Sequence, residues 1–192
     1  ASNNTAVGFE ALVANTTGAN NNAFGKQAMA DNTTGSNNTA IGHNALTANT
    51  TADSNTSIGY ASMLANTTGA SNTAVGRQAL TSNTTAANNT AVGMSALILN
   101  TTGAGNTATG SGALYSSATG SDNVAAGRNS LYTNTTGDNN TALGVNSLGA
   151  NTTGYENVAV GQGALDANTT AFRNIAIGVN SLGANTTGTY NI

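Results

Sequence analysis

Small apolar and aliphatic residues recur along this chain at a fixed interval, and the interval predicts the architecture. A residue that is usually aliphatic, followed by glycine, returns every 17 residues from Val7-Gly8 to Ile177-Gly178. The repeat is N-T-A-V-G-x-x-A-L-x-A-N-T-T-G-x-N, and its positions are called slots 1 to 17, with slot 1 of the first copy at Asn4. Eleven copies follow without insertion or deletion. Such phasing indicates stacked coils, in which a one-residue slip would turn side chains to the wrong face.

Each copy is expected to form one coil of an all-β, parallel β-solenoid (a β-roll) with two short strands. Slots 2 to 4, Thr-Ala-Val in the consensus, are typical of a strand. Slots 8 to 11 form a second apolar stretch around a Leu or Met, and the Asn, Thr and Gly residues of slots 12 to 15, 17 and 1 form turns. Coils about 4.8 Å apart would build a rod of roughly 50 Å. The single repeat domain is 1-192, an excerpt of a longer chain or a filament unit, with coils at 4-20, 21-37, 38-54, 55-71, 72-88, 89-105, 106-122, 123-139, 140-156, 157-173 and 174-190.

The core is expected to hold the slot-4 aliphatic and the slot-9 Leu or Met of each coil. Slots 2 and 4 point to one face of the strand and the slot-3 Ala to the other. The Ala column would then be a stripe through which identical chains associate. In the alternative reading, the Ala side chains fit the narrow interior of a monomeric coil. Copies seven and eight, with Thr109, Ser117, Ala118 and Ala126, are expected to be the loosest.

Slot 1 is Asn in every copy, although several other residues form turns equally well. Stacked Asn side chains can donate and accept along the axis, which predicts a structural amide ladder. The ladder would comprise Asn4, Asn21, Asn38, Asn55, Asn72, Asn89, Asn106, Asn123, Asn140, Asn157 and Asn174.

Composition and charge remove several classes of function. The chain has no Cys, so disulfides, thiolate zinc sites and thiol catalysis are excluded. Four Lys and Arg against seven Asp and Glu give a net charge of −3, without the basic patch that nucleic-acid binding requires. No apolar run reaches the length of a membrane span, so no membrane insertion is expected of this segment. The acids are scattered over convex corners, so we expect no enzyme, no cofactor and no metal site.

Slot 6 is the most varied column and the best candidate for an outward contact surface. Its members include Phe9, Lys26, His43, Tyr60, Arg77, Met94 and Arg128. Tyr115 and Tyr132 stack in slot 10 and could form a small apolar patch. Ten copies carry Asn-Thr-Thr, which is also an N-glycosylation sequon, although these Asn residues are better explained as corners. Slots 13 and 14 hold Thr columns, but because they are adjacent, only one would face outward.

The strand and its glycine resemble a known repeat. Asn-Thr-Ala-Val-Gly stands at 4–8, 72–76 and 89–93, with Ile variants at 38–42 and 174–178. These motifs resemble the head repeats of trimeric autotransporter adhesins, the YadA-like parallel β-roll, and similar repeat tracts of phage tail fibres. The period of 17 residues and the Thr at slot 2 of most copies depart from that pattern. The family's apolar slot-2 choice is kept at Val124, Val158, Ile175 and Ile192.

The resemblance implies a left-handed coil, a homotrimer and a place outside the cell, on a cell surface or a virion tail. The expected function is a structural and adhesive rod, the head or stalk of a surface adhesin or tail fibre. Its partners would be copies of itself, as a trimer or end to end, and an unknown surface receptor or glycan. A self-assembling extracellular filament subunit and an ice-binding solenoid are the alternatives.

Overall fold

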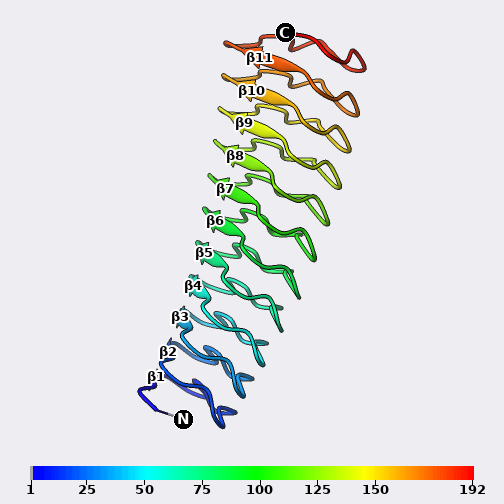
Figure 1. The fold of residues 1–192 in the computed structure, drawn as a ribbon. Helices are drawn as coiled ribbons and strands as arrows, with labels where there is room; N and C mark the ends of the chain where they lie inside the picture. The colour runs from blue at the N-terminus through cyan, green and yellow to red at the C-terminus, as the bar shows by residue number, and fades with distance from the viewer. Residues whose placement is uncertain (1) are drawn as a thin grey trace.

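The chain winds into a regular stack of coils that leans slightly along its length (Figure 1). The computed structural model describes residues 2–192. Each coil contributes one strand of three residues at slots 2 to 4, and all eleven strands join one parallel sheet in chain order. The strands are β1 (Thr5–Val7), β2 (Asn22–Phe24), β3 (Thr39–Ile41), β4 (Thr56–Ile58), β5 (Thr73–Val75), β6 (Thr90–Val92), β7 (Thr107–Thr109), β8 (Val124–Ala126), β9 (Thr141–Leu143), β10 (Val158–Val160) and β11 (Ile175–Ile177).

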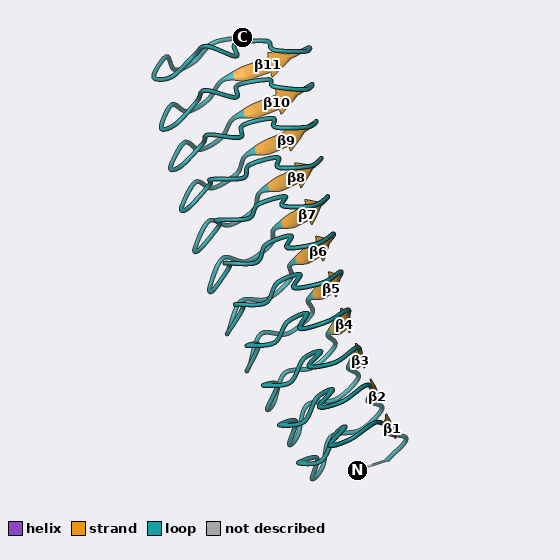
Figure 2. Cartoon of the chain, turned by 180° about the vertical axis from the view of Figure 1, so that it is seen from behind, coloured by secondary structure: helices purple, strands orange, loops and turns teal. Residues whose placement is uncertain are grey.

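The register confirms the parallel β-solenoid, because like slots lie over like slots throughout. Ala74 pairs with Ala91 and Val75 with Val92, and the same correspondence holds from β1 to β11. Strands occupy one side of the coil, and turns and loops form the rest (Figure 2). A shift of one residue in any coil would break this correspondence in every later coil.

The second strand expected at slots 8 to 11 is not found in residues 2–192. Slots 7 and 9 adopt the left-handed backbone conformation in coil after coil, as at Gln78 (φ 58°) and Leu80 (φ 54°). Two left-handed residues separated by one other cannot form an extended segment, so this stretch is a series of turns. A left-handed Leu is sterically unfavourable. Complete burial of its side chain offsets that cost.

Turns as well as strands are hydrogen-bonded to the neighbouring coil. The amide of Leu80 donates to the carbonyl of Ala96 at 2.9 Å, and that of Ser82 donates to Ile98 at 3.1 Å. At slot 13, the amide of Thr67 donates to Thr84 at 2.9 Å. Inter-coil backbone bonding therefore continues around the coil, which explains how three-residue strands suffice.

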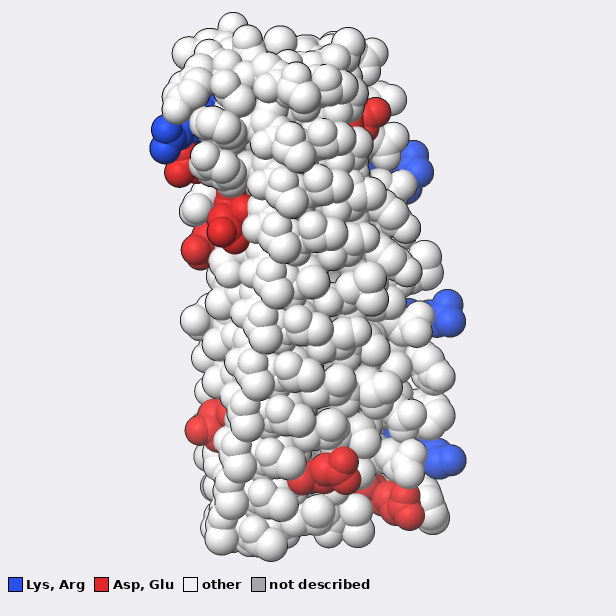
Figure 3. Space-filling view, turned by 90° about the vertical axis from the view of Figure 1, so that its right-hand side faces the viewer, with Lys and Arg blue, Asp and Glu red and all other residues white. Residues whose placement is uncertain are grey.

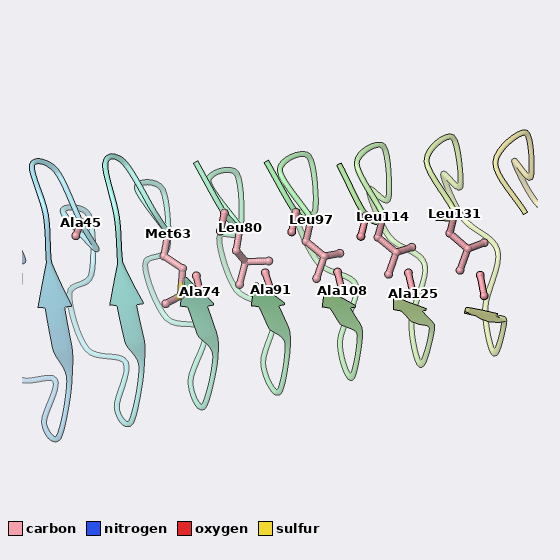
Figure 4. Packing of buried hydrophobic residues seen from close by; sticks show 14 of the residues in the cluster. Ala45, Met63, Ala74, Leu80, Ala91, Leu97, Ala108, Leu114, Ala125 and Leu131 are labelled. Carbon is pink, nitrogen blue, oxygen red and sulfur yellow. The ribbon is translucent and has the colours of Figure 1, made fainter. Parts of the chain in front are cut away.

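The core consists of slots 3, 8 and 9, which corrects the expected assignment of the strand faces. The Ala side chains of slot 3 point inward and meet the slot-9 Leu or Met from the opposite layer (Figure 4). Ala91 and Leu97 have no exposed surface, whereas the slot-4 side chain Val92 is 37% exposed. The coil is so thin that one methyl group and one larger side chain fill it. The Ala column is thus the interior, and the aliphatic column faces outward.

Slot 5 is glycine because a side chain there would collide with the backbone of the next coil and because the backbone has a positive φ. A Cβ on Gly76 would lie 2.5 Å from the carbonyl oxygen of Gly93 in the next coil. The φ of Gly76 is also +138°, a conformation that residues with side chains rarely adopt.

Candidate functional site

The slot-1 Asn residues form a continuous ladder, although its bonds differ from a simple amide stack. In each step the side-chain Oδ1 accepts the backbone amide of the next slot-1 Asn, at 2.8 to 3.1 Å. The Nδ2 of Asn72 crosses its own coil and donates to the carbonyl of Ala86 at 2.8 Å. The residues from Asn21 to Asn174 are buried in full. Each Asn therefore closes a corner within its coil and links that coil to the next.

A second ladder at slot 12 was not anticipated from the sequence. Here Nδ2 donates directly to Oδ1 of the preceding coil, as from Asn49 to Asn32 at 2.7 Å and from Asn83 to Asn66 at 2.7 Å. The same Nδ2 of Asn83 also reaches the carbonyl of Ala86 at 3.0 Å. Slot 12 holds Asn in all copies but one, so its column carried the same signal as slot 1. Turn propensity alone also accounts for an Asn at this slot, which is why the sequence does not single out this column.

This second ladder bears on the Asn-Thr-Thr sequons. The slot-12 Asn residues inside the rod are fully buried and their amides are hydrogen-bonded, so in the folded coil they are not accessible acceptors for a glycan. Most slot-13 Thr hydroxyls are hydrogen-bonded as well, as Thr67 is to the carbonyl of Thr84 at 2.9 Å. The slot-14 Thr residues are exposed. These two slots therefore present one outward rank of Thr, as expected from their adjacency.

The outward face of the sheet is uncharged along its whole length. Slots 2 and 4 contain Thr, Asn, Ala and apolar residues, with no Lys, Arg, Asp, Glu or His in any coil. Large slot-4 side chains stand in the solvent, among them Phe24 (39% exposed) and Ile41 (41%). Extended exposed apolar patches of this kind mark interaction sites. We call this surface, slots 2 and 4 of all coils, the outer strand face.

The slot-6 column lies next to the outer strand face, beyond the slot-5 glycine. All seven of its candidate contact residues are exposed. Neighbours along the column touch: the ammonium of Lys26 lies 5.9 Å from the ring centre of Phe9, and the rings of His43 and Tyr60 meet edge to face at 5.5 Å. The structure thus places these residues together in one outward row. Their role in contact is a prediction.

Charged residues gather at edges of the rod. In Figure 3, most basic side chains are spaced along the right-hand edge, another basic group lies at the upper left, and much of the surface between the two edges is uncharged. At the slot-16 and slot-17 corner, Asp138 accepts the backbone amide of Ser121 at 2.7 Å. Glu156 and Arg173 form an ion pair. The hydrogen bond to Glu156, followed by that to Tyr190, raises the pKa of Arg173 above its ordinary value. These acids have structural partners at the corner, and the ion pair is a contact between neighbouring coils within the slot-17 column.

The tyrosines of slot 10 stack as expected. The ring centres of Tyr115 and Tyr132 lie 4.8 Å apart with planes 19° from parallel. Beyond Tyr132 the column changes abruptly, because the next coil has Gly149 at this slot. A hollow of about 300 Å³ opens there.

Within residues 2–192, no group of three His, Asp or Glu side chains is arranged to hold a metal ion. The same part of the chain contains no helix with the length and hydrophobicity needed to cross a membrane. Compared with known proteins, the chain matches no family model, no curated protein and no solved structure.

Proposed function

We propose that this chain is a structural and adhesive rod of an extracellular fibre, and that its copies associate side by side through the outer strand face. The observation that carries the proposal is the uninterrupted, uncharged and partly apolar character of that face over eleven coils. A soluble chain without a partner has little reason to keep Val, Ile, Leu or Phe at its most exposed strand position.

A second copy of the chain is the partner that fits best. The large apolar side chains of slot 4 follow the coil spacing in every coil except those of Thr109 and Ala126, so a surface with the same axial spacing is needed to meet them in register. Another copy has that spacing by construction. Closed symmetric association would bury the face on every copy. The trimer, the left-handed winding, the adhesive role and the cell-surface or virion-tail location rest on the resemblance of the repeat to adhesin heads and tail fibres.

Sedimentation of the whole chain tests the proposal. We expect a trimer, and we expect monomers when Ile41, Ile58 and Val75 of the outer strand face are all changed to Glu, because the three charges would be desolvated between chains. The control changes Thr51, Thr68 and Thr85 to Glu. These slot-14 residues are exposed in the same coils and stack their charges equally closely. A wild-type chain that stays monomeric at all concentrations would refute the association.

Ice binding is a second candidate function, and it would use the outer strand face rather than the Thr columns of slots 13 and 14. The outer strand face holds Thr at slot 2 of five consecutive coils, from Thr39 to Thr107, beside the slot-4 rank. The two ranks form a regular array on a parallel sheet. A partner chain and ice would compete for the same face, so thermal hysteresis of a monomeric chain would favour ice binding.

A further inference from the structure

The hollow beside Tyr132 arises in slot 10, a variable column that holds a tyrosine in one coil and a glycine in the next. One face of the Tyr132 ring is covered by Tyr115, at 4.8 Å between centres. In the next coil Gly149 offers no side chain to cover the other face. The hollow is lined by Tyr132, Thr133, Ala150 and Gly149, together with Asn129, Asn146 and Asp166.

Three of the polar side chains that line this hollow have no hydrogen-bond partner in the described part of the chain. Within residues 2–192, no side-chain hydrogen bond is made by the amides of Asn129 and Asn146 or by the carboxylate of Asp166. By contrast, Thr133 uses its hydroxyl to hold the carbonyls of Gly149 and Asn151, at 2.8 and 3.0 Å. The floor is therefore fixed, while the rim offers amide donors and acceptors and one charged acceptor.

We propose that this hollow is a binding site for a pyranose sugar. An aromatic ring with one free face presents a flat apolar platform, which suits the C–H face of a pyranose. Two amides and a carboxylate at the rim suit its hydroxyl groups, which both donate and accept hydrogen bonds. The volume of about 300 Å³ admits one or two sugar rings. Slot 10 lies on the layer opposite the strands, so the site does not depend on association through the outer strand face.

Gly149→Tyr provides a sharp test, because it would extend the tyrosine stack by a third ring and fill the hollow. Gly149 does not have a positive φ, so the backbone accepts a side chain. The nearest atom to a new Cβ is Oδ1 of Asp166, at 2.6 Å, which belongs to an exposed and movable side chain. The matched control is Gly183→Tyr. This substitution adds the same side chain at slot 10 two coils away and leaves the hollow open.

Saturation-transfer NMR on the whole chain would use the methyl β-pyranosides of glucose, galactose and N-acetylglucosamine as probes. We expect transfer to at least one of them, with affinity about tenfold lower in Gly149→Tyr and unchanged in Gly183→Tyr. Tyr132→Phe keeps the platform and should bind within about twofold of the wild type, whereas Tyr132→Leu should lose about tenfold. Circular dichroism confirms that each variant is folded. Phenol serves as a control for non-specific binding of a ring to the Tyr132 side chain. The proposal is overturned if no pyranoside receives transfer, if phenol receives it and no pyranoside does, or if Gly149→Tyr binds the pyranosides as the wild type does.

Discussion

Coil 5 and coil 7 have the same backbone, but their side-chain bonding differs. In coil 5, the slot-15 carbonyl of Ala86 accepts two amides, from Asn72 at 2.8 Å and from Asn83 at 3.0 Å. In coil 7, slot 12 is Ser117, and the corresponding carbonyl of Gly120 accepts only the amide of Asn106. The hydroxyl of Ser117 has no partner.

The side-chain hydrogen bonds that are missing at coil 7 also leave a group in coil 6 without a partner, while the backbone register does not change. The Oδ1 of Asn100 in coil 6 is left buried without a partner, because the serine has no amide to offer it. Yet β7 and β8 still pair in register, and Ala118 still donates its amide to Thr135 at 3.0 Å. The comparison separates two roles: backbone bonds set the register, and the Asn ladders add side-chain bonds that satisfy the buried polar groups at the corners.

The largest effect is expected when the intact coil loses a ladder donor and gains a charge. Asn72→Asp puts a carboxylate against the carbonyl of Ala86 in a fully buried site, and we expect a loss of about 3–5 kcal/mol in the free energy of unfolding. Burial beside a carbonyl raises the pKa of this carboxyl in the folded state. The folded state then binds more protons, so the stability of the variant should fall as the pH rises from about 4, the ordinary pKa of Asp, to the raised folded-state pKa, and it should be fully recovered below about pH 4.

Thermal and denaturant unfolding at neutral and acidic pH would measure this change. The control is Asn88→Asp, at an exposed slot-17 position in the same coil, where we expect a change within about 0.5 kcal/mol. Equal melting of the two variants at neutral pH would show that the slot-1 ladder adds little.

A smaller loss should follow when coil 5 is made to resemble coil 7. Asn83→Ser removes the bonds to Asn66 and to Ala86 and leaves buried polar atoms unpaired. We expect a loss of about 1–3 kcal/mol, measured by denaturant unfolding. Asn88→Ser is the control, because slot 17 is already Ser71 in the coil before. Unchanged stability in Asn83→Ser would mean that water satisfies the orphaned groups.

The reverse substitution should repair coil 7. Ser117→Asn restores a donor for Asn100 and for the carbonyl of Gly120, and we expect a gain of about 1 kcal/mol in the free energy of unfolding. Ser116→Asn, one residue earlier at slot 11, adds the same side chain outside the ladder and should gain nothing. A destabilised Ser117→Asn would show that the corner of coil 7 has relaxed around the serine.

The sequence predicted the period, the parallel stacking and the slot-1 ladder, because all three follow from equivalent residues lying over one another. It did not predict which face of the strand is inside. Ala91 and Val92 are both apolar, and their pattern alone does not reveal that the coil is only wide enough for a methyl group opposite Leu97. The predicted second strand was wrong because the Leu at slot 9 adopts a left-handed conformation. Local preference disfavours that conformation, and burial of the side chain stabilises it. The hollow beside Tyr132 depends on Gly149, a residue of the variable slot 10 whose effect is visible only when the coils are stacked.

The smallest expected effect is on the local opening of coil 7, as measured by amide hydrogen exchange. Side-chain bonds that are missing in coil 7 lower the free energy needed to open it locally, so its amides should exchange faster than those of coil 5. Each 1.4 kcal/mol of local stability corresponds to about tenfold in exchange. Hydrogen exchange should therefore show reduced protection at slot 13 of coil 7, at Ala118, relative to Thr84 in coil 5, since both amides donate to the next coil. Ser117→Asn should remove the difference. If protection is uniform in the wild-type chain, the backbone bonds alone determine how each coil opens.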